Sequence, residues 1–294
     1  MPDNFPDEWR VGTTPLRPRR DRRAAWGLAI LGMLTLVALG APFLAGHDPL
    51  AQGDVVATRF TPPLHADGLG TFHLLGTDRF GRDVWSRLIY GARISLATGL
   101  LATLIAVVLG GVVGLVAGVW RGRTATALLA VTDFALALPR VVLLLLLAAL
   151  WRPGATLVVV VLGLTGWMGI ARLVYGEATA IMARPFILSA RALGAHRARL
   201  AWHHVLPGTW TPIVVAAALG VGNAITLEAG LSFLGLGVQP PAPSWGSMIA
   251  SGRDTLVNAP WVAVAPGVAL VLVVVACTLV GDALRDRMEH EGEV

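Results

Sequence analysis

The sequence predicts an all-α polytopic membrane protein that crosses the bilayer six times. Of its 294 residues, 55% are hydrophobic and 14% are charged, and the mean hydropathy is +0.69. A soluble domain of this length could not bury so much apolar surface and still cover itself with polar side chains. Six apolar runs approach or exceed the roughly 20 residues that cross a hydrocarbon core. They are Ala24–Ala45, Ile94–Trp120, Thr126–Trp151, the stretch between Arg152 and Arg172, Val205–Leu227 and Pro260–Gly281.

The arginines that flank these runs predict the orientation. The stretch Arg17–Arg23 precedes the first run and places the N-terminus in the cytoplasm. Alternation then makes Trp120–Arg123, Arg184–Gly208 and Arg285–Arg287 cytoplasmic as well, so both termini are expected inside. The first run is longer than the roughly 7–15-residue core of a signal peptide, and we expect it to stay as an anchor.

Composition excludes several classes of chemistry. All 23 positive charges are arginine, so the chain has no lysine for a nucleotide-binding P-loop or a Schiff base. The sequence pI of about 10.8 reflects arginines beside apolar runs, and we expect no nucleic-acid partner. The single Cys277 cannot form an intrachain disulfide, and the seven histidines show no metal-ligand spacing. No cofactor and no metal site are expected.

The third run is the weakest of the six because it contains Asp133 and Arg140. On one interpretation the turns before Asp133 lie along the interface, the crossing begins near Pro139, and Arg140 extends to the headgroups. The alternative makes Asp133 and Arg140 an intramembrane functional pair on one helix face.

The second run carries Gly110, Gly114 and Gly118, one small residue on each of three successive turns of one face. Small residues allow two helices to approach closely in lipid, where no hydrophobic effect drives their association. The pattern predicts tight packing of this helix and does not identify its neighbour.

The basic stretch Arg184–Gly208 predicts two short helices joined at a glycine. Pro185 suits a helix start, Gly194 can end that helix in a left-handed cap, and a second piece from His196 to Val205 would stop before Pro207. A loop that obeyed only the positive-inside rule would not need apolar residues. We expect exposed apolar side chains at Phe186, Ile187, Leu193, Leu200 and Trp202, which would fit a soluble partner.

The same stretch resembles the signature of ABC importer permeases, in which a glycine precedes the proline of a Leu-Pro pair by thirteen residues, as Gly194 precedes Pro207. The family's usual Glu-Ala-Ala triplet falls on Leu188, Ser189 and Ala190, so its acidic residue is missing. The resemblance implies a coupling helix that docks on an ATP-binding subunit. Its residues would be Phe186, Leu188, Ser189, Ala190, Arg191, Leu193, Gly194, Leu200, Trp202 and Pro207.

Three further segments are similar to the C-type permease subunit of the dipeptide/oligopeptide/nickel branch: Leu74–Leu96, Glu228–Ile249 and Ala259–Asp286. This resemblance implies a type I ABC importer permease fold and a multi-pass protein of the bacterial inner membrane. It implies import of di- or oligopeptides, nickel or related small solutes, and no ATPase site in this chain. The implied partners are a second homologous permease, two ABC ATP-binding subunits and an extracytoplasmic solute-binding protein.

With this resemblance the chain divides into a cytoplasmic basic segment (1–23), a first helix (24–46), an extracytoplasmic loop (47–93), a five-helix core (94–282) with a coupling loop (176–207), and a cytoplasmic tail (283–294). The charges of Gly76–Asp83 do not have calcium-loop spacing, and we expect them to pair with one another or to contact a binding protein. We interpret Glu228 as a helix-end or packing group. The sequence identifies no substrate-binding residue.

Two other classes remain as alternatives. A secondary transporter would need buried ionisable groups that carry coupling ions, and only Asp133, Arg140 and Glu228 lie near membrane depth. An intramembrane hydrolase would need a nucleophile and its base within the spans, and no run contains a Ser–His pair or two facing aspartates.

Overall fold

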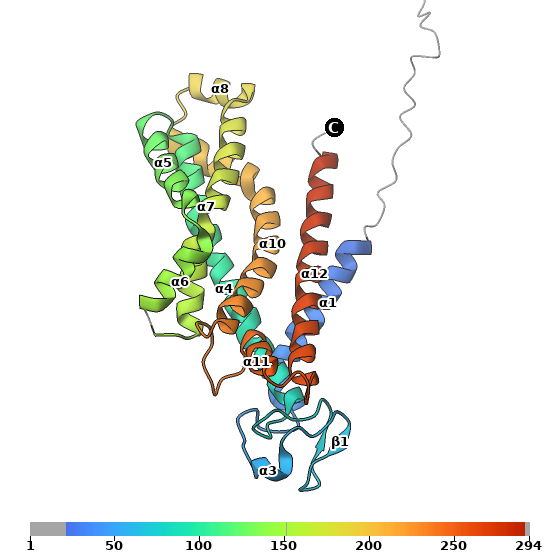
Figure 1. Ribbon diagram of the computed structural model, residues 1–294. Coiled ribbons are helices and arrows are strands. Elements are labelled where there is room, and N and C mark those ends of the chain that lie inside the picture. Colours follow the sequence, from blue (N-terminus) through green and yellow to red (C-terminus); the bar gives the residue numbers. More distant parts are fainter. Residues whose placement is uncertain (1–21, 151, 292–294) are drawn as a thin grey trace, which may run out of the picture.

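The computed structural model describes residues 22–150 and 152–291, which form a bundle of long helices (Figure 1). Within these residues, five helices are long and apolar enough to cross a membrane. They are α1 (Arg22–Leu39), α4 (Val84–Val119), α7 (Ala155–Met182), α10 (Leu206–Phe233) and α12 (Trp261–Glu291). The basic segment 1–23 lies almost wholly outside the described residues. The expected tail begins inside a helix, because α12 continues to Glu291.

The third apolar run forms two helices, α5 (Arg123–Ala137) and α6 (Arg140–Leu150). They are separated at Leu138, whose backbone is extended (φ −73°, ψ 133°). The following Pro139 explains this break, since its ring disfavours helical geometry in the residue before it. Neither helix alone is as long as the other five, and the six expected spans therefore appear as five long helices and one broken pair.

Helices α4 and α7 pack closely against each other. Cβ atoms built on Gly110 and Gly114 would lie 2.5 Å from the carbonyl oxygens of Trp167 and Ala171, and one on Gly118 would lie 2.4 Å from Cβ of Ala178. The glycine face of α4 thus lies directly on the backbone of α7. This contact identifies the neighbour that the sequence left open.

One end of the bundle carries a short helix, α8 (Pro185–Ala192), and the opposite end carries a small subdomain (Figure 1). The subdomain contains α2 (Ala41–Leu44), α3 (Val55–Thr58) and an antiparallel hairpin of β1 (His65–Ala66) with β2 (Phe72–His73). The hairpin departs from the all-α expectation. Helix α11 (Trp245–Arg253) packs between α10, α12 and the start of α4 near this end.

The glycine contact gives a direct test of the packing. Gly114→Ala should destabilise the protein by about 1–3 kcal/mol, because its methyl group would meet a backbone oxygen that a side-chain rotation cannot move. Gly111→Ala is the matched control: a Cβ there meets nothing within 4 Å. We expect the Tm of the purified protein in detergent to fall for Gly114→Ala and to stay level or rise for Gly111→Ala. Equal Tm values would contradict the close contact.

Candidate functional site

The basic stretch forms the expected helix, glycine and second helix at one end of the bundle. Helix α8 ends in a Schellman arrangement: the N–H of Gly194 donates to the Arg191 carbonyl and the N–H of Ala195 donates to the Ala190 carbonyl, each at 3.0 Å. Gly194 has φ +87°, the left-handed conformation that this cap requires. No atom lies within 4 Å of a Cβ built there, so a side chain at this position would point into open space.

The second half of the stretch does not stop before Pro207. Helix α9 (Arg197–Leu200) continues through a π turn, η2 (Ala201–Val205), directly into α10. The N–H of Leu206 bonds to the Ala201 carbonyl, five residues earlier. This wider turn lies just before Pro207, which has no backbone N–H to donate. The chain nevertheless stays helical through the proline.

Two apolar residues that we expected to be exposed are buried. Ile187 and Leu200 are both 0% exposed, and they pack with Ile181, Val205 and Val119 in one cluster. The sequence pattern was wrong for this pair because α8 folds back against the ends of α4 and α7. Ile187 and Leu200 therefore anchor the stretch instead of offering contacts to a partner.

The other apolar residues remain on the surface. Leu193 is 90% exposed, Trp202 66%, Leu188 52% and Phe186 49%. The Phe186 ring meets the His204 ring edge-on at 5.8 Å, which joins α8 to η2. We call the exposed side chains Phe186, Leu188, Arg191, Leu193 and Trp202 the α8 surface.

Positive charge surrounds the α8 surface. Arg191, Arg197 and Arg199 are exposed, and among the residues that the structure describes no carboxylate forms an ion pair with them. Ser189 is also exposed, and its hydroxyl donates to the Pro185 carbonyl. An apolar patch with free arginines around it suits a partner that offers both apolar and acidic groups.

Asp133 forms an ion pair with an arginine on a neighbouring helix. Its carboxylate accepts from Arg172 on α7, with Arg172 Nε 2.8 Å from Asp133 Oδ1, and the guanidinium Nη2 contacts the same oxygen. Both side chains are about half exposed, at 51% for Arg172 and 47% for Asp133. The side chain of Arg140 is not among those described. Sequence spacing could not find Arg172 because it lies on a different helix.

Glu228 is a buried tie between three helices. Its side chain is among the fully buried ones, and its carboxylate oxygens accept from the hydroxyls of Ser95, Ser232 and Ser244 at 3.3, 2.8 and 3.0 Å. Ser244 also caps the N-terminus of α11, and Ser95 accepts from the backbone N–H of Trp245. Glu228 therefore connects α4, α10 and α11, and its surroundings fit a packing group.

Two of the four charges of Gly76–Asp83 pair with each other, which is one of the two outcomes expected from the sequence. Arg82 forms an ion pair with Asp78 at 2.7 Å, and Asp78 also accepts from the backbone N–H groups of Phe80 and Arg82. Asp83 caps α4 by accepting from the N–H of Ser86 at 2.7 Å. These bonds hold the start of α4 to the subdomain.

The fold brings together residues that could resemble a metal site, a grouping that sequence spacing did not indicate. One ligand atom each from His47, His73 and Asp83 lies within 4.8 Å of the others. His73, however, already uses both ring nitrogens: Nδ1 lies 2.8 Å from Asp83 Oδ1 and Nε2 lies 3.3 Å from Asp67 Oδ2. The arrangement is satisfied by hydrogen bonds alone and fits a structural tie of the subdomain.

The other carboxylate of this tie, Asp67, is stabilised in its charged form. Burial raises the pKa of Asp67, but hydrogen bonds from the Thr71 N–H, from His73 and from the Leu69 N–H outweigh it and hold the pKa below its usual value.

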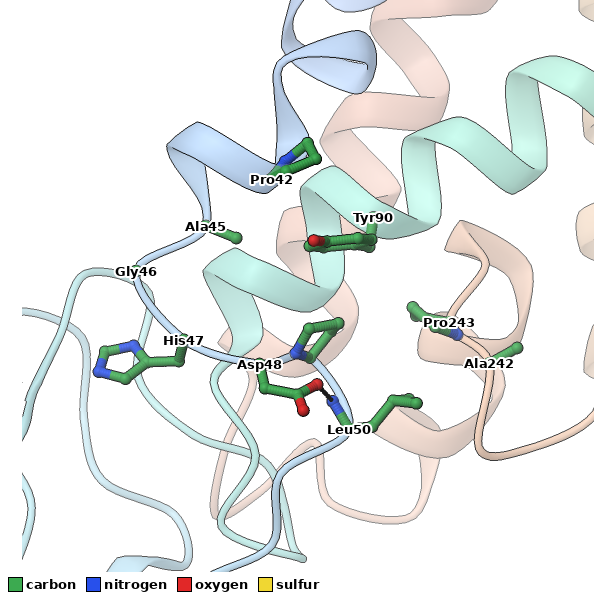
Figure 2. Close-up of a pocket in the computed structure, with 10 residues that line it drawn as sticks. Pro42, Ala45, Gly46, His47, Asp48, Leu50, Tyr90, Ala242 and Pro243 are labelled. Carbon is green, nitrogen blue, oxygen red and sulfur yellow. Dashed lines mark hydrogen bonds between the residues drawn. The ribbon is translucent and has the colours of Figure 1, made fainter.

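An open hollow of about 650 Å³ lies beside this subdomain. Figure 2 shows the 45–50 segment on one side of it and Ala242 with Pro243 on the other, while Tyr90 extends from α4. Asp48 turns back on its own segment, where it accepts from the Leu50 N–H at 2.8 Å. The hollow is a surface depression between the first loop and the segment before α11.

Comparison with known proteins bears directly on this arrangement. Residues 106–291 match the family model of the binding-protein-dependent transport system inner membrane component. The chain belongs to this family. Residues 16–63 also match the model of the N-terminal transmembrane domain of oligopeptide transport permease C. The protein is therefore an inner-membrane permease component, as the resemblance implied.

Its relatives include several peptide permeases. The chain is 37% identical to a putative peptide transport system permease of Brucella abortus, over 96% of this chain and 94% of that protein. It is 38% identical to the di/tripeptide transport system permease DppC of Pseudomonas aeruginosa, over 92% and 88%. It is 36% identical to the glutathione transport system permease GsiD of Pectobacterium atrosepticum, over 92% and 87%.

A solved structure shares the fold. A chain of the MetNI methionine ABC transporter, in an inward-facing conformation, superposes with a TM-score of 0.54 at 22% identity, over 68% of this chain and 95% of that one. The helical core thus has the fold of an ABC importer permease.

The connection that Glu228 makes between the three helices can be tested by measuring thermal stability. Glu228→Leu should lower the Tm in detergent, because it leaves buried hydroxyls without an acceptor at a cost of about 1–3 kcal/mol. Glu228→Gln keeps one acceptor oxygen and should lose less. If Glu228→Leu unfolds at the wild-type temperature, the carboxylate does not tie the three helices together.

Proposed function

We infer that this chain is the C-type permease subunit of an ATP-driven peptide importer and that the α8 surface is its contact with an ATP-binding subunit. The observation that carries the proposal is an apolar, arginine-flanked surface around α8, the helix that is capped by Gly194. Such a surface is costly to leave in water and needs a partner that covers it.

The packing beneath the α8 surface supports a coupling role. Ile187 and Leu200 anchor it in a cluster that contains Val119 at the end of α4 and Ile181 near the end of α7. A force applied to α8 would therefore act on two membrane helices at once. The residues proposed as direct contacts are Phe186, Leu188, Arg191, Leu193 and Trp202, with Ser189 and Ala190 beside them. Gly194 and Pro207 shape the backbone.

We assign the α8 end to the cytoplasm and the hairpin subdomain to the extracytoplasmic side, with α5 and α6 together completing a sixth crossing. The unpaired arginines around α8 support this orientation, since cytoplasmic loops carry an excess of arginine. The subdomain, with its neighbouring hollow, is then available to a solute-binding protein.

The partners follow from the family. A second homologous permease, two ABC ATP-binding subunits and an extracytoplasmic binding protein would complete the importer. Peptide cargo is supported by the di/tripeptide and glutathione permeases among the relatives. None of the relatives named here supports nickel.

Copurification tests the docking surface. Leu193→Asp should release the ATP-binding subunit from a tagged importer in mild detergent, because it places a charge in an apolar contact. Val257→Asp is the control: Val257 is 97% exposed, similar to Leu193, but lies just before α12 at the opposite end. The second permease should remain bound in both variants. Normal recovery of the ATPase with Leu193→Asp would contradict docking at α8.

Gly194 offers a second test. Gly194→Arg should abolish peptide uptake while the chain still inserts in the membrane, because a long side chain at φ +87° projects outward into the contact. Gly194→Asn tolerates the left-handed backbone better and should lose less uptake. Uptake by proteoliposomes of the complete importer measures both. Uptake driven by a proton gradient without ATP would instead support a secondary transporter.

A further inference from the structure

A hollow of about 410 Å³ lies between α5 and three of the helices long enough to cross the membrane, α4, α7 and α10. Small residues on its walls, among them Ala106, Gly166 and Gly220, leave the space open. Its polar lining consists of Thr103, Thr165 and Asn223, and no charged residue is among the described residues that line it. The hollow is therefore neutral, with a few polar groups on an apolar background.

Thr103 is the first sign that this hollow receives a ligand. The residue is 5% exposed, and its buried hydroxyl has no hydrogen-bond partner in the part of the chain that the structure describes. Thr98 on the same helix and Thr165 on α7 instead donate to carbonyls one turn back, both at 2.8 Å. A buried hydroxyl without a partner is unfavourable, so its retention indicates a partner that arrives from outside the chain.

Asn223 is the second sign. It lies in the interior of α10, exposed and on the wall of the hollow. Its amide forms no hydrogen bond with any residue that the structure describes. A carboxamide facing lipid at this depth would be unfavourable, so this wall faces water or a polar molecule.

The ion pair extends the polar side of the bundle beyond the hollow. Asp133 lies three residues before Leu136 on α5, and Arg172 lies three residues after Gly169 on α7, so each shares a helix face with a residue of the wall. Arg172 lies on the part of α7 that leads to α8. Half-exposed charges there reinforce the conclusion that this side does not face lipid.

We propose that this hollow binds the amide groups of the peptide cargo during its passage, with the Thr103 hydroxyl and the Asn223 amide as hydrogen-bond partners. A hydroxyl and a carboxamide can each donate and accept, and a peptide group presents one N–H and one carbonyl. Uncharged hydrogen-bonding groups of this kind can bind the backbone of any peptide without selecting for its side chains. This proposal rests on the peptide importer proposed above.

Thiol labelling tests access to the hollow. The one native cysteine, Cys277, is 3% exposed and gives little background. Asn223→Cys in the complete importer should react with a water-soluble thiol reagent. Trialanine at about ten times its apparent Kd should slow the reaction roughly tenfold, by mass action. Val271→Cys, an exposed apolar position on α12, is the control and should not react. An unreactive Asn223→Cys, or one that trialanine does not protect, overturns the proposal.

Thr103→Val gives an independent test, since it removes the hydroxyl at nearly constant shape. We expect the KM for trialanine uptake to rise roughly three- to tenfold, as for one lost hydrogen bond, while the Tm stays level or rises. Thr98→Val, whose hydroxyl is satisfied within its own helix, should leave the KM unchanged. An unchanged KM in Thr103→Val overturns the proposal. A wild-type importer that does not transport trialanine would instead refute the proposed peptide function.

Discussion

The backbone contact between α4 and α7 is the constraint on which the rest of the structure depends. In lipid no hydrophobic effect drives helices together, so close van der Waals contact must stabilise their association. Gly110, Gly114 and Gly118 allow that contact over three turns. At one end it reaches the cluster in which Ile187 and Leu200 anchor the α8 stretch. The glycine face therefore places the surface proposed for the ATPase on a stiff pair of helices.

Regular helical geometry is interrupted at three points along the chain. Pro139 divides the third apolar run, Gly194 reverses the backbone after α8, and the π turn before Pro207 joins α9 to α10 without a break. The first permits α5 and α6 to take different directions. The π turn makes α9 and α10 one continuous helical path, and the turn at Gly194 connects α8 to its start.

Sequence patterns predicted those features that depend on residues close together in the chain. Hydropathy and length identified the long helices, and the glycine pattern and the Gly194 cap depend on residues close in sequence. Contacts between distant segments were not predictable in this way. The burial of Ile187 and Leu200 depends on how α8 meets α4 and α7, the Asp133–Arg172 pair joins α5 to α7, and His73 meets Asp83 only after the hairpin forms. The unpartnered Thr103 hydroxyl is likewise a property of packing, since the sequence does not show whether a threonine hydroxyl finds a hydrogen-bond partner.

The same contacts bear on ion coupling as a source of energy for transport. An ion-coupled carrier needs an ionisable group that exchanges its ion with a path through the membrane. Glu228 is enclosed by three serine hydroxyls and does not line the hollow, and Asp133 is already neutralised by Arg172. Glu228 and Asp133 are thus both held by partners within the chain. The described residues that line the hollow carry no charge. In the proposed importer an ATP-binding subunit would supply the driving force at the exposed α8 surface, which Ile187 and Leu200 fix to the ends of α4 and α7.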